Sequence, residues 1–244
     1  MTVPSDAKLA TIRKLLAQAE DTAASPAEAE TFTAKAAELM ARYGVDLAML
    51  ADGDSSADEI ADRWITLDPP YALDKRDLLT SIARALGLRA ILRTIPGGEI
   101  SAMLFGYRSD LERSEILFTS LLLQAVRGMV ATPVPPSENK AAFRRAWLAG
   151  FSATVWRRLQ AAEQRAREEA TESGSTSATG RSAELVLADR RSTVDAQFAE
   201  AFPRLGTARN RRLSSGRGHE AGVEAGARAD LGHPGLSRRR ALRH

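Results

Sequence analysis

Two amphipathic helices joined by a short turn lie within residues 1–51, and this pair restricts the fold more than any other stretch. The second helix begins at Ser25-Pro26-Ala27-Glu28, which combines an N-cap serine, a proline at the first helical position and a glutamate at the third. Apolar side chains recur at three- and four-residue steps on both helices. They are Leu9, Ile12, Leu16 and Ala19 on the first, and Ala29, Phe32, Ala36, Leu39, Met40 and Tyr43 on the second.

The end of this pair also carries a local signal. Gly44 has the freedom to adopt a left-handed C-cap conformation, and Asp46 is placed to cap a further short helix from Leu47 to Leu50. Because the connection between the two main helices is short, we expect them to pack antiparallel. Residues 1–51 therefore predict a small helical module, a helical hairpin followed by a short helix.

This pattern resembles domain-of-unknown-function family 2786 (DUF2786), a short helical module common in bacteria and phages. The matching stretches are Ile12 to Ala17, Ala19 to Thr22, Glu28 to Glu30, Ala34 to Ala36 and Leu39 to Val45. The resemblance covers about residues 7–50. The region from Trp64 onward is similar to the segment that commonly follows this module, through its element order and its "LVLADR" and "GVEAGARADLG" stretches. Neither resemblance implies an activity.

The remainder predicts a second, α+β domain over residues 64–170, after an acidic linker at 52–63. Its expected elements follow one another as a strand, a helix, a β-hairpin and two long helices. They are Trp64 to Leu67, Asp74 to Leu86, the two hairpin strands 88–95 and 99–107, Ser109 to Met129, and Asn139 to Ala170. The hairpin turns at Pro96-Gly97-Gly98, and Ser109 to Glu112 repeats the capping-box spacing.

Three further segments complete the expected organisation. Residues 171–182 predict a flexible linker, residues 183–203 a short strand or helix segment, and residues 204–244 an Arg-rich, partly disordered tail. Within the tail, the alanine-rich stretch around Gly222 and Gly226 predicts a short helix whose glycines allow close helix contact. The fold class is thus α+β and predominantly helical.

Composition excludes several functional classes. Cysteine is absent, which rules out disulfides, thiol nucleophiles and cysteine metal sites. The first ten residues show no apolar core typical of a signal peptide, and the longest apolar run, Ile116 to Val126, is too short to span a bilayer. We expect a soluble cytoplasmic protein that does not enter a membrane. Its net charge of +3 is uneven, with −6 in residues 1–63, +4 in 64–170 and +5 in 171–244.

The sequence contains few residues that match known catalytic patterns. His219, His233 and His244 all lie in the Arg-rich tail, so solvent exposure explains them better than metal binding or base catalysis. Ser137 and Lys140 match a Ser-x-x-Lys spacing without the companion motifs. The glycines of the hairpin join two strands, whereas a phosphate loop leads into a helix. We therefore expect no cofactor and no bound metal.

One carboxylate cluster leaves a catalytic alternative open. Asp110, Glu112 and Glu115 gather at an expected helix start, where the helix dipole is a sufficient structural reason for them. A metal-dependent hydrolase that uses these three carboxylates is the remaining enzymatic interpretation.

Basic residues indicate a second possible function. Arg89 and Arg93 should share a strand face with Met103 and Phe105, and basic residues interleaved with an aromatic on a sheet bind single strands in other proteins. The candidate contacts for a partner or for nucleic acid are Arg13, Lys14, Arg89, Arg93, Phe105, Arg144, Arg145, Arg157, Arg158, Arg211 and Arg212. The first interpretation is a non-enzymatic protein that binds an unknown protein partner. The alternative is an accessory protein of phage or bacterial DNA processing that binds nucleic acid.

Overall fold

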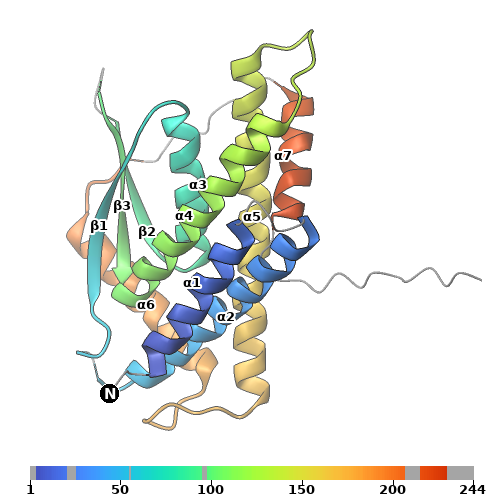
Figure 1. Cartoon of the computed structure of the whole chain (residues 1–244). Helices are drawn as coiled ribbons and strands as arrows, with labels where there is room; N and C mark the ends of the chain where they lie inside the picture. Colours follow the sequence, from blue (N-terminus) through green and yellow to red (C-terminus); the bar gives the residue numbers. More distant parts are fainter. Residues whose placement is uncertain (1–3, 21–25, 55, 95–97, 207–214, 230–244) are drawn as a thin grey trace, which may run out of the picture.

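The computed structural model describes residues 4–20, 26–54, 56–94, 98–206 and 215–229. Within these ranges, seven helices accompany a three-stranded antiparallel sheet, which confirms the predominantly helical α+β class (Figure 1). The elements are α1 (Pro4–Glu20), α2 (Pro26–Ala51), β1 (Ile60–Leu67), α3 (Ala72–Ala85), β2 (Arg89–Thr94), β3 (Ile100–Tyr107), α4 (Arg108–Ala131), α5 (Lys140–Glu172), α6 (Ala183–Ala201) and α7 (Gly216–Arg228).

The sheet has strand order β1-β3-β2, with β3 in the centre. The β2–β3 hairpin is confirmed, and its register places Arg89 opposite Phe105 and Arg93 opposite Ser101. Directly paired residues point to the same side of a sheet. Arg89, Arg93 and Phe105 therefore share one face, as the alternation predicts. The opposite face carries the buried Ala102 and Leu104 of β3 toward the helices.

The outer face of the sheet is partly covered by α6, which lies behind the sheet in Figure 1. Phe198 and Phe202 of α6 pack on Phe105, with ring centroids 5.6 and 6.0 Å away. This contact buries part of the surface on which a base would have to stack.

The core is built around α5, the longest helix. Trp147 and Phe151 of α5 are fully buried and stack with a centroid separation of 5.4 Å. Ile12 of α1 and Met40 of α2 belong to the same hydrophobic cluster as the buried residues of α3, α4 and β3. The described apolar residues of the N-terminal helices, Leu9, Ile12 and Leu16 of α1 and Ala36, Met40 and Tyr43 of α2, therefore lie in a core that these helices share with the rest of the chain.

Helix α7 runs parallel to α5 and meets it through glycines. Gly218, Gly222 and Gly226 face Phe143, Trp147 and Phe151 of α5 in that order. A β-carbon at Gly222 would overlap the carbonyl oxygen of Trp147, and one at Gly226 would lie 2.8 Å from the Thr154 Cβ. The glycine spacing thus allows close backbone contact, as the sequence predicts for this short helix.

Three helix boundaries differ from expectation. Helix α2 continues through Gly44 to Ala51 without a separate short helix, and Gly44 is required because the Arg113 guanidinium occupies the space of a side chain there. Helix α4 begins at Arg108, and the Asp58 carboxylate, instead of a local serine, accepts from the Ser109 amide at 3.1 Å. Asp74 lies buried inside α3, which begins at Ala72. Ser25 of the expected capping box lies outside the described residues.

The described residues of the C-terminal third contain more secondary structure than the sequence predicts. Helix α5 extends to Glu172, residues 176 and 182 form an isolated β-bridge, and residues 183–201 are helical. The Arg-rich region contains α7, whereas residues 207–214 and 230–244 lie outside the described ranges. Of the described helices, α4 has the length and composition of a membrane-crossing helix, yet it supplies Leu111, Leu117 and Leu121 to the core.

Candidate nucleic-acid interface

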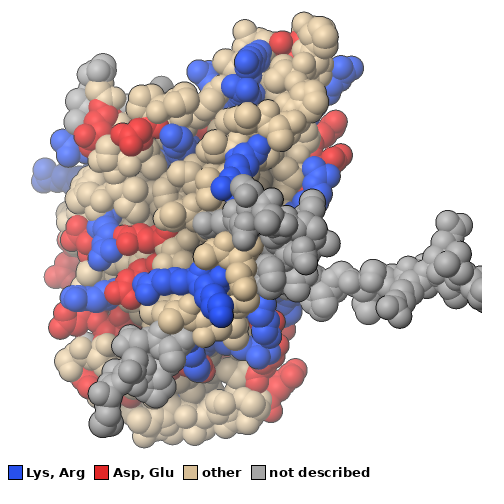
Figure 2. Space-filling view, in the orientation of Figure 1, with Lys and Arg blue, Asp and Glu red and all other residues tan. Residues whose placement is uncertain are grey.

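Charge is segregated along α5. Residues 140–162 of this helix contain five basic and no acidic side chains, whereas residues 163–172 contain two basic and four acidic ones. The five are Lys140, Arg144, Arg145, Arg157 and Arg158. In Figure 2, basic and acidic side chains are interspersed over the sheet and α1, while basic ones predominate at the end where α4 leads into α5. The first two-thirds of α5 are therefore a local concentration of positive charge.

Part of this charge lies on one exposed line of the helix. Arg145, Ala149, Ala153 and Arg157 follow at four-residue steps, so successive members are neighbours on the surface of α5 and the line winds around the helix by about 40° per step. Arg145, Ala153 and Arg157 are exposed and Ala149 is half-buried. Two arginines with only alanines between them leave room for an extended ligand along the helix.

The start of α7 adds a further cation. Gly218 lies against the carbonyl group of Phe143, which places the exposed Arg217 within about one turn of Lys140 and Arg144. We call Lys140, Arg144, Arg145, Arg157 and Arg217 the α5 basic surface. Among the described residues, no carboxylate forms an ion pair with any of these five. The exposed Lys140, Arg145, Arg157 and Arg217 can therefore offer their charge to a ligand, whereas Arg144 is half-buried.

The position of basic residues in the first turns of α5 and α7 is unfavourable for the stability of these helices. Neither α5 nor α7 has an acidic residue in its first turn, although the positive end of the helix dipole favours acidic side chains there. Lys140 and Arg217 occupy those turns instead. Asn139 and Ser215 cap the two helices with side-chain oxygens, and the Ser215 hydroxyl also donates to the Glu138 carboxylate. Local departures of this kind are concentrated at functional sites.

The sheet residues expected to bind nucleic acid are mostly occupied. The Arg89 Nε donates to Asp195 of α6 at 2.6 Å, and Phe105 is covered by the α6 phenylalanines. The Arg93 guanidinium lies 5.8 Å from the ring centroid of Trp64, which is about half exposed. The structure therefore brings these residues together on one face, but it engages Arg89 and Phe105 in packing against α6.

The other predicted contacts are dispersed. Arg158 donates to the carbonyl oxygens of Gly226 and Ala227, at 2.8 and 3.0 Å, and so binds the C-terminal end of α7. Arg13 and Lys14 are exposed on α1, separate from the α5 basic surface. Arg211 and Arg212 lie outside the described residues.

The carboxylates of the enzymatic alternative do not converge. Asp110 accepts from Arg113 at 2.7 Å, Glu115 pairs with Arg63 at 2.7 Å, and Glu112 is exposed on another side of α4. Within the described ranges, no group of three or more histidine or carboxylate side chains is arranged to hold a metal ion. Asp110 and Glu115 thus serve two different ion pairs.

The N-terminal helical hairpin is the part of the chain that comparison with known proteins recognises. Residues 7–47 match the family model described as "Protein of unknown function (DUF2786)". Residues 7–47 are a DUF2786 domain. No curated protein and no solved structure matches the chain. The DUF2786 domain ends within α2, four residues before Ala51, so its second helix runs on into the junction with the rest of the fold.

A buried ion cluster joins the DUF2786 domain to α4 and α5. The Arg113 side chain is 3% exposed, lies against Gly44 and donates to both Asp110 and Glu163. Burial opposes the charge of Arg113, but Glu163 and Asp110 outweigh it and raise its pKa. Burial also raises the pKa of Glu163, against the attraction of Arg113. In this buried cluster, each charged side chain is stabilised by its oppositely charged neighbours, so removal of one leaves another buried charge uncompensated.

Next to this cluster, Arg190 of α6 connects the sheet to α4. It donates to Asp58 at 2.5 Å, and its guanidinium lies 3.5 Å from the ring centroid of Tyr107. Burial raises the pKa of the Tyr107 hydroxyl, although the charge of Arg190 opposes that change. These residues line a cavity of about 530 Å³ together with Asp52, Asp54 and Glu59. Sequence reasoning missed this junction because its members are far apart in the chain.

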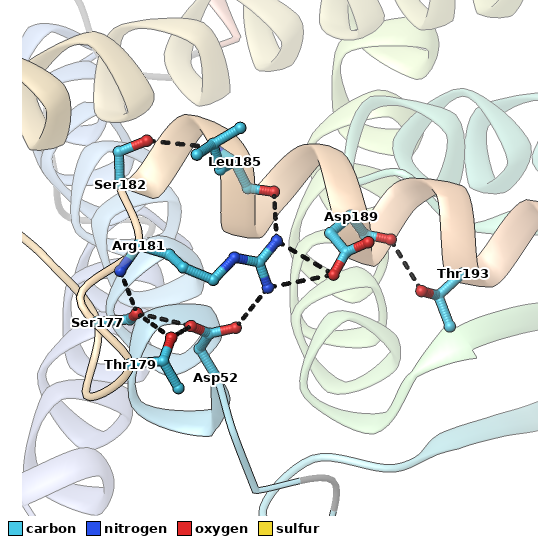
Figure 3. A network of polar contacts seen from close by, with 8 residues as sticks. All are labelled: Asp52, Ser177, Thr179, Arg181, Ser182, Leu185, Asp189 and Thr193. Atoms are coloured by element: carbon cyan, nitrogen blue, oxygen red, sulfur yellow. Dashed lines mark hydrogen bonds and ion pairs between the residues drawn. The ribbon is translucent and has the colours of Figure 1, made fainter.

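A second polar network fixes the segment after α5 to the end of α2 (Figure 3). The Asp52 carboxylate accepts from Ser177 at 2.6 Å, from Thr179, and from Arg181 at 3.0 Å. Arg181 also pairs with Asp189 of α6 at 3.2 Å. Residues 171–182 were expected to form a flexible linker, and Ser177, Thr179 and Arg181 of this segment bind the Asp52 side chain at the end of α2.

The Asp52 network predicts a pH-dependent contribution to stability. The hydrogen bonds from Ser177 and Thr179, and then the charge of Arg181, lower the pKa of Asp52 below 3.8. A depressed carboxyl pKa stabilises the fold above the ordinary pKa, and this contribution is lost as the pH falls through the folded value. Asp52→Asn should lower the free energy of unfolding by about 1–2 kcal/mol at neutral pH, measured by urea denaturation.

The matched control is Asp54→Asn. Asp54 is exposed and accepts from Ser56 within its own turn, which also lowers its pKa, so its replacement should change the free energy of unfolding less than Asp52→Asn does. A loss for Asp52→Asn that stays the same below about pH 3 would contradict the role assigned to its charge.

Proposed function

We propose that the chain is a non-enzymatic binding protein that contacts nucleic-acid phosphates through the α5 basic surface. The supporting observation is that four cations without a described carboxylate partner, Lys140, Arg144, Arg145 and Arg217, lie in the first two turns of two adjacent helices, and that Arg157 continues this charge along α5. Folding favours acidic side chains at those positions. A polyanionic ligand supplies the missing negative charge.

Phosphate contacts of this kind position a nucleic acid without reading its sequence. Lysine and arginine release condensed counterions when they neutralise phosphates, so affinity should fall steeply as salt is added. The exposed line of Arg145, Ala149, Ala153 and Arg157 follows α5 for three turns, which suits a backbone that lies along the helix. Arg217 and Lys140 extend the contact at the helix starts.

The test removes three charges from this surface. Lys140→Ala/Arg145→Ala/Arg217→Ala should weaken binding of fluorescently labelled strands of about 30 nucleotides by roughly tenfold or more. It should also reduce the slope of log affinity against log salt by about 2–3, because three phosphate contacts are lost. Fluorescence anisotropy over a series of salt concentrations measures both quantities.

The matched control removes the same charge elsewhere. Arg13→Ala/Lys14→Ala/Lys35→Ala lies on α1 and α2, where Lys35 pairs only with the exposed Glu38 among the described residues. This variant should keep the affinity and salt slope of the unaltered protein. Equal losses in both variants would show binding by net charge and would reject the α5 basic surface as the site. Absence of binding at low salt would reject the proposed function.

A further inference from the structure

An arginine of α3 lies over the ring of a tryptophan of α5, next to the α5 basic surface. The Arg84 guanidinium carbon is 4.3 Å from the centre of the Trp156 ring. Trp156 is half-buried and directly precedes Arg157, whereas Arg84 is exposed. The pair therefore adds a planar cation beside the line of Arg145, Ala149, Ala153 and Arg157.

Arg84 makes no ion pair with a described carboxylate, and its guanidinium lies over the ring of Trp156. A guanidinium is planar and weakly hydrated, which allows it to stack on a ring with one side and to receive another flat group on the other. Its N–H groups at the edge remain available to phosphate or to base oxygens. The exposed side of Arg84 is thus a small stacking platform with a positive charge.

The pair also strengthens the contact between α3 and α5, as cation–π pairs at exposed sites contribute about 0.5–1 kcal/mol. Because the pair lies beside the line of Arg145 and Arg157, it can also contact a ligand that binds there. A strand whose phosphates follow Arg145 and Arg157 places its bases beside Trp156 and Arg84. In a duplex the flat faces of the bases are covered by their neighbours, whereas an unpaired strand can turn a base outward.

We infer that the α5 basic surface takes single-stranded nucleic acid, with an unpaired base stacked on the Arg84–Trp156 pair. This inference rests on the proposed function and adds the class of nucleic acid. Stacking of bases on aromatic and arginine planes tolerates any sequence, because every base presents a flat face. The surface should therefore prefer single strands over duplexes without preferring one sequence.

The experiment compares two strands of equal length and charge, oligothymidylate and an abasic strand of about 20 sugar phosphates. The unaltered protein should bind oligothymidylate about tenfold more tightly than the abasic strand. Arg84→Lys keeps the charge but removes the plane, so it should lose most of this preference while its affinity for the abasic strand stays the same. Arg145→Lys, at an unstacked position, should keep the preference. Circular dichroism verifies that each variant is folded.

The outcomes separate the inference from the proposed function. Equal affinity of the unaltered protein for both strands overturns base stacking and leaves phosphate binding in place. Binding of a duplex as tightly as oligothymidylate overturns the preference for single strands. A preference that survives in Arg84→Lys overturns the role of Arg84. Failure to bind either strand at low salt rejects the proposed function itself.

Discussion

Arg113→Met is expected to lower the free energy of unfolding by about 3–5 kcal/mol at pH 8, the largest effect of any single change considered. Methionine fills much of the space of the arginine stem but removes the ion-pair partner of the buried Glu163, which keeps only the weaker attraction of Arg167. Asp110 retains Arg190, at 3.6 Å. The energetic loss is therefore concentrated at Glu163. Urea denaturation followed by circular dichroism measures it.

The loss should depend on pH in a defined direction. The pKa of Glu163 is raised by burial above its ordinary value of 4.5, so the folded state holds this proton more tightly than the unfolded state. The stability contributed by Glu163 is then full below that ordinary value and declines as the pH rises through the folded value. Without Arg113 the pKa rises further. Arg113→Met should consequently be less destabilised at pH 5 than at pH 8.

A second substitution isolates the cause. Arg113→Met/Glu163→Gln removes the stranded charge and should recover a large part of the stability at pH 8, because a neutral amide costs less to bury than a carboxylate. A double variant as unstable as Arg113→Met would show that lost packing around Gly44, and not the unpaired carboxylate, determines the effect.

Gly222→Ala is expected to destabilise the fold by about 3 kcal/mol, near the upper end for one added methyl group in a packed contact. The new β-carbon would overlap the carbonyl group of Trp147, which is backbone and has no rotamer to change. Helix α7 must move away from α5 along its length, and the contacts of Gly218 and Gly226 are lost with it. For a chain of this size the melting temperature should fall by roughly 6–12 °C.

Gly216→Ala provides the control on the same helix. No atom lies within 4 Å of a β-carbon added there, so this change tests helix propensity alone. It should be neutral or stabilising by about 0.4–1 kcal/mol. Equal melting temperatures for Gly222→Ala and the unaltered protein would contradict the close backbone contact between α5 and α7.

The periodicity of apolar residues in the sequence was sufficient to predict most helices and strands of the fold. The alternating runs on either side of Pro96-Gly97-Gly98 gave the β2–β3 hairpin, and Asn139 caps α5 as its position indicates. Gly44 shows where such reasoning fails. A glycine near a helix end predicts a C-cap, but here its missing side chain admits Arg113, which comes from a helix more than sixty residues away.

The candidate site was only partly accessible from the sequence. Arg144, Arg145, Arg157 and Arg158 were predicted from the sequence as basic residues of one long helix, whereas Lys140 and Arg217 were not among the predicted contacts. Arg84 carries no such signal, because its contact with Trp156 depends on how α3 packs against α5. Two other predicted contacts are already engaged within the fold. Arg89 donates to Asp195, and Arg158 donates to the carbonyl oxygen of Gly226 in α7. No local sequence pattern reveals these partners, because they are far away in the chain.

The parallel pairing of α5 with α7 also has a consequence for synthesis on the ribosome. Trp147 leaves the ribosome 75 residues before Gly222, the residue that covers its carbonyl group. At typical bacterial or eukaryotic elongation rates this interval lasts about 4–15 s. During that time the nascent chain presents one bare side of its central helix to the cellular environment. Completion of the core is thus a late event of translation, set by the arrival of a thirteen-residue helix.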